Sequence, residues 1–320
     1  MKNIIIGCPF DNGIRSMLRF SRGITGADEG PDAIFSVFEK EYLEKYRDIK
    51  MEMLSLQKYN LKIDANNMHE LAFRRAQKDA TIQAQDTMTK KIKELCEQGY
   101  TTLGIGGDHS ISYALCRGVC EANPCKKVGI IYIDAHFDMR QLDEGEVISS
   151  GNSFRRLIED ETLNISGDNI VVIGIHHSVS EIYCELEKYA ISKNVTIVYD
   201  DEVKDIDKIV KNALEIAGRN TDLIYLSVDI DSVNEQFVPG VSAPAERGIT
   251  DEQLYGLIKG IAKDNRVSAF DIVETSSRKL AWTELVKNEK RNETEKERTE
   301  KLARTAKIAA KAIDSFLSAK

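Results

Sequence analysis

The sequence predicts an α/β fold: three-layer α/β/α, with a parallel sheet of about eight strands between two layers of helices. Short apolar runs, rich in β-branched residues, alternate with longer stretches of helical periodicity along the 320 residues. Strands of this composition are buried on both faces, as in parallel sheets, and each helix returns the chain by a right-handed crossover. No internal repeat and no linker rich in proline or glycine interrupts this alternation, so we expect one domain over residues 1–320.

The expected strands are short apolar runs bounded by turn or helix signals. They cover residues 3–7, 52–55, 102–106, 128–133, 170–175, 195–199, 223–229 and 267–273. Helical periodicity lies near 68–98, 110–122, 179–193, 203–218, 250–263 and 294–318. The charged insertion near 287–301 contains "NEKRNETEKERTEK", with five acids and five bases, and we expect a solvated loop that leads into a charged helix start.

Composition narrows the classes of function. The chain is 42% hydrophobic and 30% charged, and its net charge of −8 argues against a nucleic-acid groove or an anionic membrane surface as partner. No apolar run approaches the roughly 18 residues of a membrane helix, and "MKNIIIGCPFDNG" reads as a first strand rather than a secretory signal. The six cysteines include no C-x-x-C pair and are expected to be reduced core thiols. We therefore expect a cytoplasmic protein whose main partner is neither a nucleic acid nor a membrane.

Acids and histidines follow four of the expected strands. They occur in the motifs "GIGGDHS", "DAHFD", "SVDIDS" and "DIVETS". In "DAHFD" the polar residues alternate by two, which aims them to one side of an extended chain. Each motif alone is consistent with a helix cap or a turn. Since ligands of open α/β sheets bind outside the carboxyl ends of the strands, and clustered acids repel without a cation, the four together indicate a metal site.

The candidate metal ligands comprise four carboxylates and two imidazoles. They are His109, Asp134, His136, Asp138, Asp229 and Asp231. This set is too large for one ion and suits two that share carboxylates. Oxygen-rich ligands with one histidine per ion favour Mn²⁺, although Fe²⁺, Co²⁺, Ni²⁺ or Zn²⁺ could substitute. Two such ions lower the pKa of a shared water, which predicts a hydrolase acting on a carbon or phosphorus centre.

These motifs resemble those of the ureohydrolases, the family of arginase, agmatinase, guanidinobutyrase and formimidoylglutamase. The resemblance extends over nearly the whole chain, from "GCPFDNG" and "GADEGPDAI" through the three metal motifs to the closing "TAKIAAKAI". It implies a three-layer α/β/α fold and a dinuclear manganese centre, two Mn²⁺ per chain, held by the six residues named above. It also implies a homo-oligomer, often a trimer or hexamer.

Within that family the chain looks most like formimidoylglutamase. Arg140 stands where the arginase pattern has a small amide, Phe154 in "SSGNSFRRL" where it has a proton-shuttling histidine, and "PGVSAPAERG" (239–248) is similar to the formimidoylglutamase loop. The resemblance implies hydrolysis of N-formimino-L-glutamate to L-glutamate and formamide. Asn234, and the segment "SSRKLAWTEL" after Glu274, depart from the family pattern and leave the pocket shape on that side open.

The expected roles at the site follow from the chemistry of that substrate, which has two carboxylates and an amidinium head. Guanidinium groups bind carboxylates in bidentate fashion, and Arg140 with Arg155, rather than Arg156, is expected to do so. Asp138, taken as the family's bridging ligand, is expected to carry a proton to the leaving nitrogen, and Glu274 to accept amidinium N–H groups. The expected substrate-binding residues are Arg140, Ser150, Asn152, Arg155 and Glu274. Either His176 or His177 could line the pocket.

Three other functions stay open on the sequence. The nearest is a guanidino-acid hydrolase that releases urea. A metal-dependent deacetylase on the related fold has fewer carboxylate ligands and lacks G-G-D-H. A non-catalytic oligomeric scaffold would be favoured by the loss of a metal ligand, and all six are present.

Overall fold

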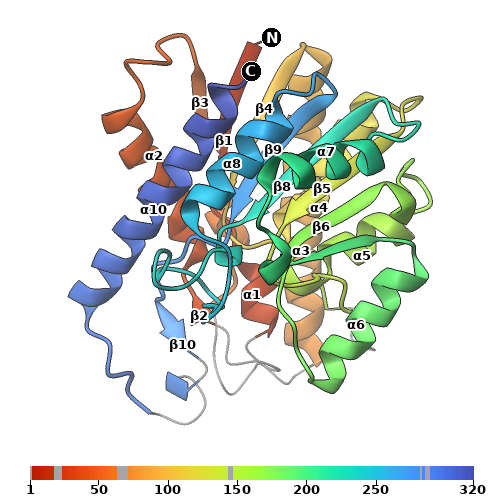
Figure 1. Ribbon diagram of the computed structural model, residues 1–320. Helices are drawn as coiled ribbons and strands as arrows, with labels where there is room; N and C mark the ends of the chain where they lie inside the picture. Colours follow the sequence, from red (N-terminus) through yellow and green to blue (C-terminus); the bar gives the residue numbers. More distant parts are fainter. Residues whose placement is uncertain (1, 18–23, 63–70, 143–146, 282, 285–288) are drawn as a thin grey trace.

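Eight parallel strands form one sheet between two layers of helices in the computed structural model (Figure 1). The structure describes residues 2–17, 24–62, 71–142, 147–281, 283–284 and 289–320. The sheet has the order β3-β1-β4-β9-β8-β5-β6-β7, and every neighbouring pair is parallel. The predicted architecture is confirmed.

The strands coincide closely with the predicted runs. They are β1 (Lys2–Cys8), β3 (Lys50–Met53), β4 (Tyr100–Gly106), β5 (Val128–Ile133), β6 (Ile170–Ile175), β7 (Thr196–Tyr199), β8 (Leu223–Asp229) and β9 (Val267–Val273). A short antiparallel pair, β2 (Ile24–Thr25) with β10 (Leu280–Ala281), lies apart from the sheet. Only the second predicted strand is displaced, because residues 50–53 rather than 52–55 pair with β1.

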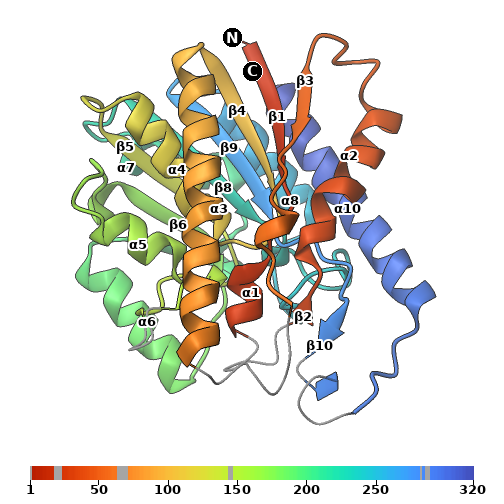
Figure 2. The ribbon, with the colours of Figure 1, turned by 180° about the vertical axis from the view of Figure 1, so that it is seen from behind.

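Helices cover both faces of the sheet. They are α1 (Asn12–Met17), α2 (Gly30–Glu41), α3 (Leu71–Glu97), α4 (Ile111–Ala122), α5 (Ser153–Glu159), α6 (Glu181–Ser192), α7 (Ile206–Ala217), α8 (Asp251–Ala262) and α10 (Glu295–Leu317). One core lies under α2, α7, α8 and α10, in front in Figure 1, and the other under α3, α4, α5 and α6, in front in Figure 2. None of the described helices is both long and apolar enough to cross a membrane.

Three helices of the structure were not among those expected from the sequence: α1, α2 and α5. Helix α2 begins with Gly30 and Pro31, and a proline in the first turn suits a helix because its missing N–H has no partner there. Its apolar positions Ile34 and Phe38 are completely buried against the sheet. Tertiary burial, rather than strong intrinsic propensity, therefore supports this helix.

The charged segment before α10 is held more firmly than a solvated loop. Glu293 lies 3.3 Å from Arg278 and also contacts Lys301, and Arg291 Nε lies 3.0 Å from Glu284. The side chains of Arg291 and Glu293 are only 10% and 12% exposed. The expectation of a solvated loop is therefore wrong for these residues, because each forms ion pairs with oppositely charged side chains of neighbouring segments.

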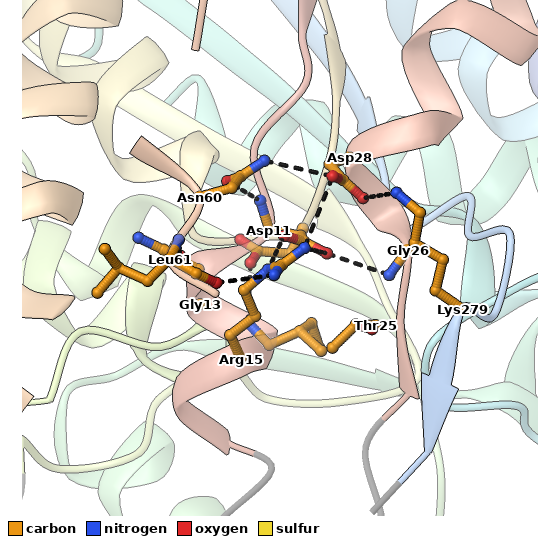
Figure 3. A network of polar contacts seen from close by, with 12 residues as sticks. Asp11, Gly13, Arg15, Thr25, Gly26, Asp28, Asn60, Leu61 and Lys279 are labelled. Carbon is orange, nitrogen blue, oxygen red and sulfur yellow. Dashed lines mark hydrogen bonds and ion pairs between the residues drawn. The ribbon is translucent and has the colours of Figure 1, made fainter. Parts of the chain in front are cut away.

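A buried polar network fixes α1 against the segments that follow β1 (Figure 3). Arg15 forms an ion pair with Asp11 and lies 3.6 Å from Asp28. Lys279 lies 3.5 Å from the other oxygen of Asp28, and Asn60 accepts the backbone N–H of Asp11 at 3.2 Å. The network therefore joins four segments that are distant in the sequence and restrains the position of α1 beside the carboxyl ends of the strands.

The network makes one contribution to stability depend on pH. Burial and the nearby charge of Asp11 raise the pKa of Asp28 from 3.8 to about 6. The folded state then holds this proton more tightly than the unfolded state, so the stability contributed by Asp28 falls as pH rises from about 4 to about 6. We expect the unfolding free energy of Asp28→Asn, minus that of the parent, to become more positive over this range by about 1–3 kcal/mol. Denaturant titrations at several pH values measure it, and a difference independent of pH would contradict the assignment.

Candidate metal centre

Four adjacent central strands deliver the candidate ligands to one edge of the sheet. His109 follows β4, Glu274 follows β9, Asp229 ends β8 and Asp134 follows β5, and these strands are neighbours in the order β4-β9-β8-β5. The turn after β4 requires glycine, because a Cβ on Gly107 would lie 1.8 Å from a backbone carbonyl oxygen. Side chains separated by more than a hundred residues therefore converge outside the carboxyl ends of the strands.

The six predicted ligands form two groups that could each hold a metal ion. The first is His109, Asp134, Asp138 and Asp229, and the second is Asp134, His136 and Asp231. His109 Nδ1 lies 3.2 Å from Asp134, 2.9 Å from Asp138 and 3.3 Å from Asp229. His136 Nδ1 lies 3.5 Å from Asp134 and 3.3 Å from Asp231. The structure thus brings together every residue that the sequence motifs singled out as a ligand.

Asp134, rather than Asp138, is the carboxylate common to both groups. One of its oxygens faces His109, and the other faces His136 and accepts the His136 backbone N–H at 2.7 Å. Asp138 has a left-handed backbone (φ 46°) and directs its carboxylate to the first group alone. The expectation that Asp138 is the bridging ligand is therefore corrected.

Unpaired polar atoms and perturbed pKa values show that these side chains fit a cation pair. His109 Nδ1, Asp134 Oδ2 and Asp231 Oδ1 are buried and make no hydrogen bond of normal geometry. Burial and the charges of two neighbouring carboxylates raise the pKa of Asp229 well above its ordinary value. Burial lowers the pKa of His109, but three carboxylates outweigh it and raise that pKa well above the usual value. Bound cations would relieve the repulsion and supply the missing partners.

A chain of buried hydroxyl and carboxyl groups supports His109 from behind. Its Nε2 lies 3.0 Å from Ser227 Oγ, which donates at 2.6 Å to Asp271 Oδ1, and Tyr225 donates to the other oxygen of Asp271. This arrangement favours the tautomer that carries a proton on Nε2 and leaves Nδ1 free as a ligand. The sequence analysis missed Ser227 and Asp271. The available signal was Asp271 within an apolar strand, because a buried carboxylate is stable only with a hydrogen-bond or ionic partner.

A pocket of about 240 Å³ opens over the two groups. It is lined by Ile14, His136, Phe137, Asp138, Arg140, Ser150, Gly151, Tyr183, Leu186, Asp229, Asp231, Ser242, Ala243 and Glu274. Arg140, Ser150 and Glu274 therefore lie where substrate-binding residues are expected. No carboxylate of the described residues pairs with the Arg140 guanidinium, which lies against Gly151. Arg140 thus brings a cationic guanidinium to the pocket lining.

Two predicted substrate-binding residues lie elsewhere. Asn152 is 1% exposed, donates to the Val147 carbonyl oxygen at 3.0 Å and accepts the Ser149 N–H, so it closes a local turn. Arg155 lies on α5, where it donates to Glu159 at 2.9 Å and covers the ring of Tyr189 at 4.0 Å. The prediction for both is corrected, because local partners occupy them and neither lines the pocket.

Arg156 and Phe154 are also packing residues. Arg156 lies 3.7 Å from the centre of the Tyr113 ring, and burial lowers its pKa to about 10. Phe154 is completely buried, stacked on Tyr132 at 3.7 Å and edge-on to His109 at 5.2 Å. A histidine at position 154 would therefore lie behind a metal ligand in this structure rather than in the pocket.

His176 and His177 line a smaller neighbouring pocket of about 190 Å³ and not the pocket over the metal groups. His176 lies 3.5 Å from Asp200, and His177 stacks on Tyr199 at 4.1 Å. Neither His176 nor His177 therefore lines the pocket over the metal groups.

Comparison with known proteins identifies the family. A model described as the arginase family matches residues 1–287. The chain belongs to the arginase family. A formimidoylglutamase of Staphylococcus epidermidis is 30% identical over 274 residues, which is 84% of this chain and 77% of the relative.

The fold of this arginase-family chain matches those of solved relatives. A Trypanosoma cruzi formiminoglutamase with Mn²⁺ superposes with a TM-score of 0.72 at 21% identity, covering 99% of this chain and 93% of that one. A Bacillus caldovelox arginase gives a TM-score of 0.73 at 22% identity, covering 99% and 98%. The two superpose equally well, so the fold does not discriminate between their activities.

We expect Ser227→Ala to weaken metal binding without unfolding the protein. Loss of the hydroxyl that orients His109 should lower affinity for Mn²⁺ roughly 10- to 100-fold, because such outer partners fix a ligand's tautomer and direction. Calorimetric titration of the metal-free protein measures this change. Ser16→Ala is the matched control, since Ser16 is also buried and hydrogen-bonded but to carbonyl oxygens only. Equal Mn²⁺ affinity in both variants would contradict the role of Ser227.

Proposed function

We propose that this protein is a metal-dependent hydrolase of linear amidines, with N-formimino-L-glutamate as substrate and L-glutamate and formamide as products. The observation that carries the proposal is that Arg140, for which no ion pair with a described residue is seen, lines the same pocket as two groups of metal-ligand atoms. A relative named formimidoylglutamase, 30% identical, supports this substrate.

We propose that His109, Asp134, Asp138 and Asp229 hold one Mn²⁺ ion and that Asp134, His136 and Asp231 hold another. The Mn²⁺ of the Trypanosoma cruzi relative supports the choice of metal. When bound, the ions would lower the pKa of a water molecule and polarise the amidine.

The protein's own residues would orient the substrate and move protons. Arg140 binds a carboxylate through its planar guanidinium, and Glu274 accepts N–H groups of the amidinium. Asp138 lies on the pocket wall, where it can take a proton from the attacking water and pass it to the leaving nitrogen as the C–N bond breaks. That nitrogen becomes the amine of glutamate, and the formimino carbon leaves as formamide.

A guanidino-acid hydrolase is the second candidate, and one observation favours it. Because Arg155 points away from the pocket, Arg140 is the sole arginine among the described residues that line it. One arginine matches a substrate with a single carboxylate as readily as one with two. Arginine and agmatine fit less well, since their substrate cations would meet the charge of Arg140.

A substrate panel on the manganese-loaded protein tests the proposal. We expect about two ions per chain by elemental analysis, release of glutamate and formamide from N-formimino-L-glutamate, and little urea from arginine or agmatine. Urea released from a guanidino acid at a higher kcat/KM would favour the second candidate. Absence of turnover with every amidine and guanidine would favour a non-catalytic scaffold.

Arg140→Met should lower kcat/KM for N-formimino-L-glutamate about 30- to 1,000-fold, because loss of a charge-assisted contact in a partly buried pocket costs about 2–4 kcal/mol. Arg140→Lys should recover little, since a point charge does not reproduce the planar fork. Metal content should stay the same in both variants. Arg155→Met is the matched control, expected to leave kcat/KM unchanged. Parent-like activity of Arg140→Met would show that Arg140 does not bind substrate.

We further propose a single domain over residues 1–320 that forms a homo-oligomer, a trimer or hexamer, in the cytoplasm. The single eight-stranded sheet supports the first part. Val179 is fully exposed, and Ile182 and Ile191 on α6 are 53% and 59% exposed, which provides apolar surface for self-association.

A further inference from the structure

Ser242 presents an unpartnered hydroxyl to the pocket. The residue lies between β8 and α8 and is only 2% exposed. Its Oγ makes no hydrogen bond of normal geometry with any described residue, although the side chain lines the pocket. A buried polar group without a partner costs free energy, so its persistence in a pocket points to an occupant that completes it.

The backbone around Ser242 is fixed, so the unpartnered hydroxyl does not result from a loosely held loop. Val241 forms an antiparallel bridge with Thr275, which places Ser242 directly opposite Glu274. The N–H of Gly240 donates to a threonine side chain of α10 at 2.9 Å. The bridge and this hydrogen bond therefore hold Ser242 and Glu274 at defined positions in the pocket lining.

Glu274 provides a second unpartnered atom beside the first. Its Oε1 accepts the backbone N–H of His109 at 2.8 Å, whereas its buried Oε2 makes no hydrogen bond of normal geometry with a described residue. Burial raises the pKa of Glu274, and the Ser242 hydroxyl is near enough to oppose that rise. Glu274 also has a left-handed backbone (φ 68°), a conformation that costs free energy and persists where surrounding structure enforces it. The pocket thus contains a carboxylate oxygen and a hydroxyl oxygen side by side, each with hydrogen-bonding capacity to spare.

We propose that Ser242 is a specificity-determining residue that accepts one N–H of the substrate's amidinium group while Glu274 accepts another. The proposal deepens the proposed function and rests on it for the identity of the whole substrate. A planar amidinium has N–H donors on two nitrogens in one plane, which two neighbouring acceptors can bind together. A cation without N–H donors would satisfy the charge of Glu274 but leave the Ser242 hydroxyl unpaired.

Direct binding of formamidinium to the manganese-loaded protein tests this role. Ser242→Ala should lower formamidinium affinity roughly 10- to 150-fold by calorimetry, since one hydrogen bond to a charged donor is lost. The affinity for tetramethylammonium, which has no N–H, should not change. The melting temperature should stay equal or rise, because the alanine removes a buried hydroxyl that makes no hydrogen bond of normal geometry with the described residues.

Ser276→Ala is the matched control. Ser276 is completely buried in the neighbouring segment, but its hydroxyl donates to the Thr25 carbonyl oxygen at 3.3 Å and accepts the Arg278 N–H at 3.0 Å. This variant should lower the melting temperature and leave formamidinium affinity unchanged. We therefore expect Ser242→Ala to lower formamidinium affinity without lowering the melting temperature, and Ser276→Ala to do the reverse.

Unchanged formamidinium affinity in Ser242→Ala, or an equal loss for tetramethylammonium, would overturn the proposal. A lower melting temperature with unchanged affinity would likewise show that the hydroxyl is structural. The proposed function fails separately: if the parent does not hydrolyse N-formimino-L-glutamate but binds formamidinium in a Ser242-dependent way, the role of Ser242 stands.

Discussion

The electrostatic repulsion among carboxylates at the end of β4, β9, β8 and β5 is the constraint on which the site depends. Asp134, Asp229 and Asp231 are almost completely buried within reach of one another. Such a cluster destabilises the folded chain unless cations or protons neutralise it. The surrounding structure counters the repulsion with a rigid backbone, with histidines and with main-chain N–H donors. For example, the backbone N–H of Asp231 donates to Asp229 Oδ1 at 2.9 Å.

Two kinds of residue line the pocket. Four of them, His136, Asp138, Asp229 and Asp231, belong to the metal-ligand groups, whereas Arg140 and Ser242 do not. In the proposed function the first kind would hold the ions that activate water, and the second kind would select the substrate. A shared family fold is compatible with different substrates because residues of the second kind can differ.

The sequence predicted the sheet and the six side chains that cluster at its edge because much of the relevant information is local. Alternation by two in "DAHFD" sets the direction of Asp134, His136 and Asp138 without knowledge of any other segment. The supporting pair Ser227 and Asp271 could not be found this way, since their contact requires that β8 and β9 be neighbours in register. Sequence spacing also does not show whether Asp134 or Asp138 is the carboxylate shared by the groups of His109 and His136.

Arg155 and Asn152 were misassigned for a related reason. Their directions depend on α5 and its preceding turn, a short helix that the apolar pattern did not reveal. On a helix, a residue's direction changes by about 100° per position, so an arginine one turn from a local acid pairs with it instead of a distant ligand. Arg140, which follows a strand end and has no such acid among the described residues, points into the pocket.

The strand order has a consequence for how the protein acquires its site during folding. Strand β9 inserts between β4 and β8, and its Ala269 pairs with Thr102 and with Tyr225. The metal-binding edge is therefore closed by one of the last strands to be synthesised, through pairing across a very long loop, which is slow. Until β9 arrives, the segment after β4 has no neighbour to hold His109 beside the ligands of β8. A nascent chain thus lacks the position of His109 in the first ligand group until β9 is synthesised, whereas the second group lies on the directly paired strands β5 and β8 and does not need β9.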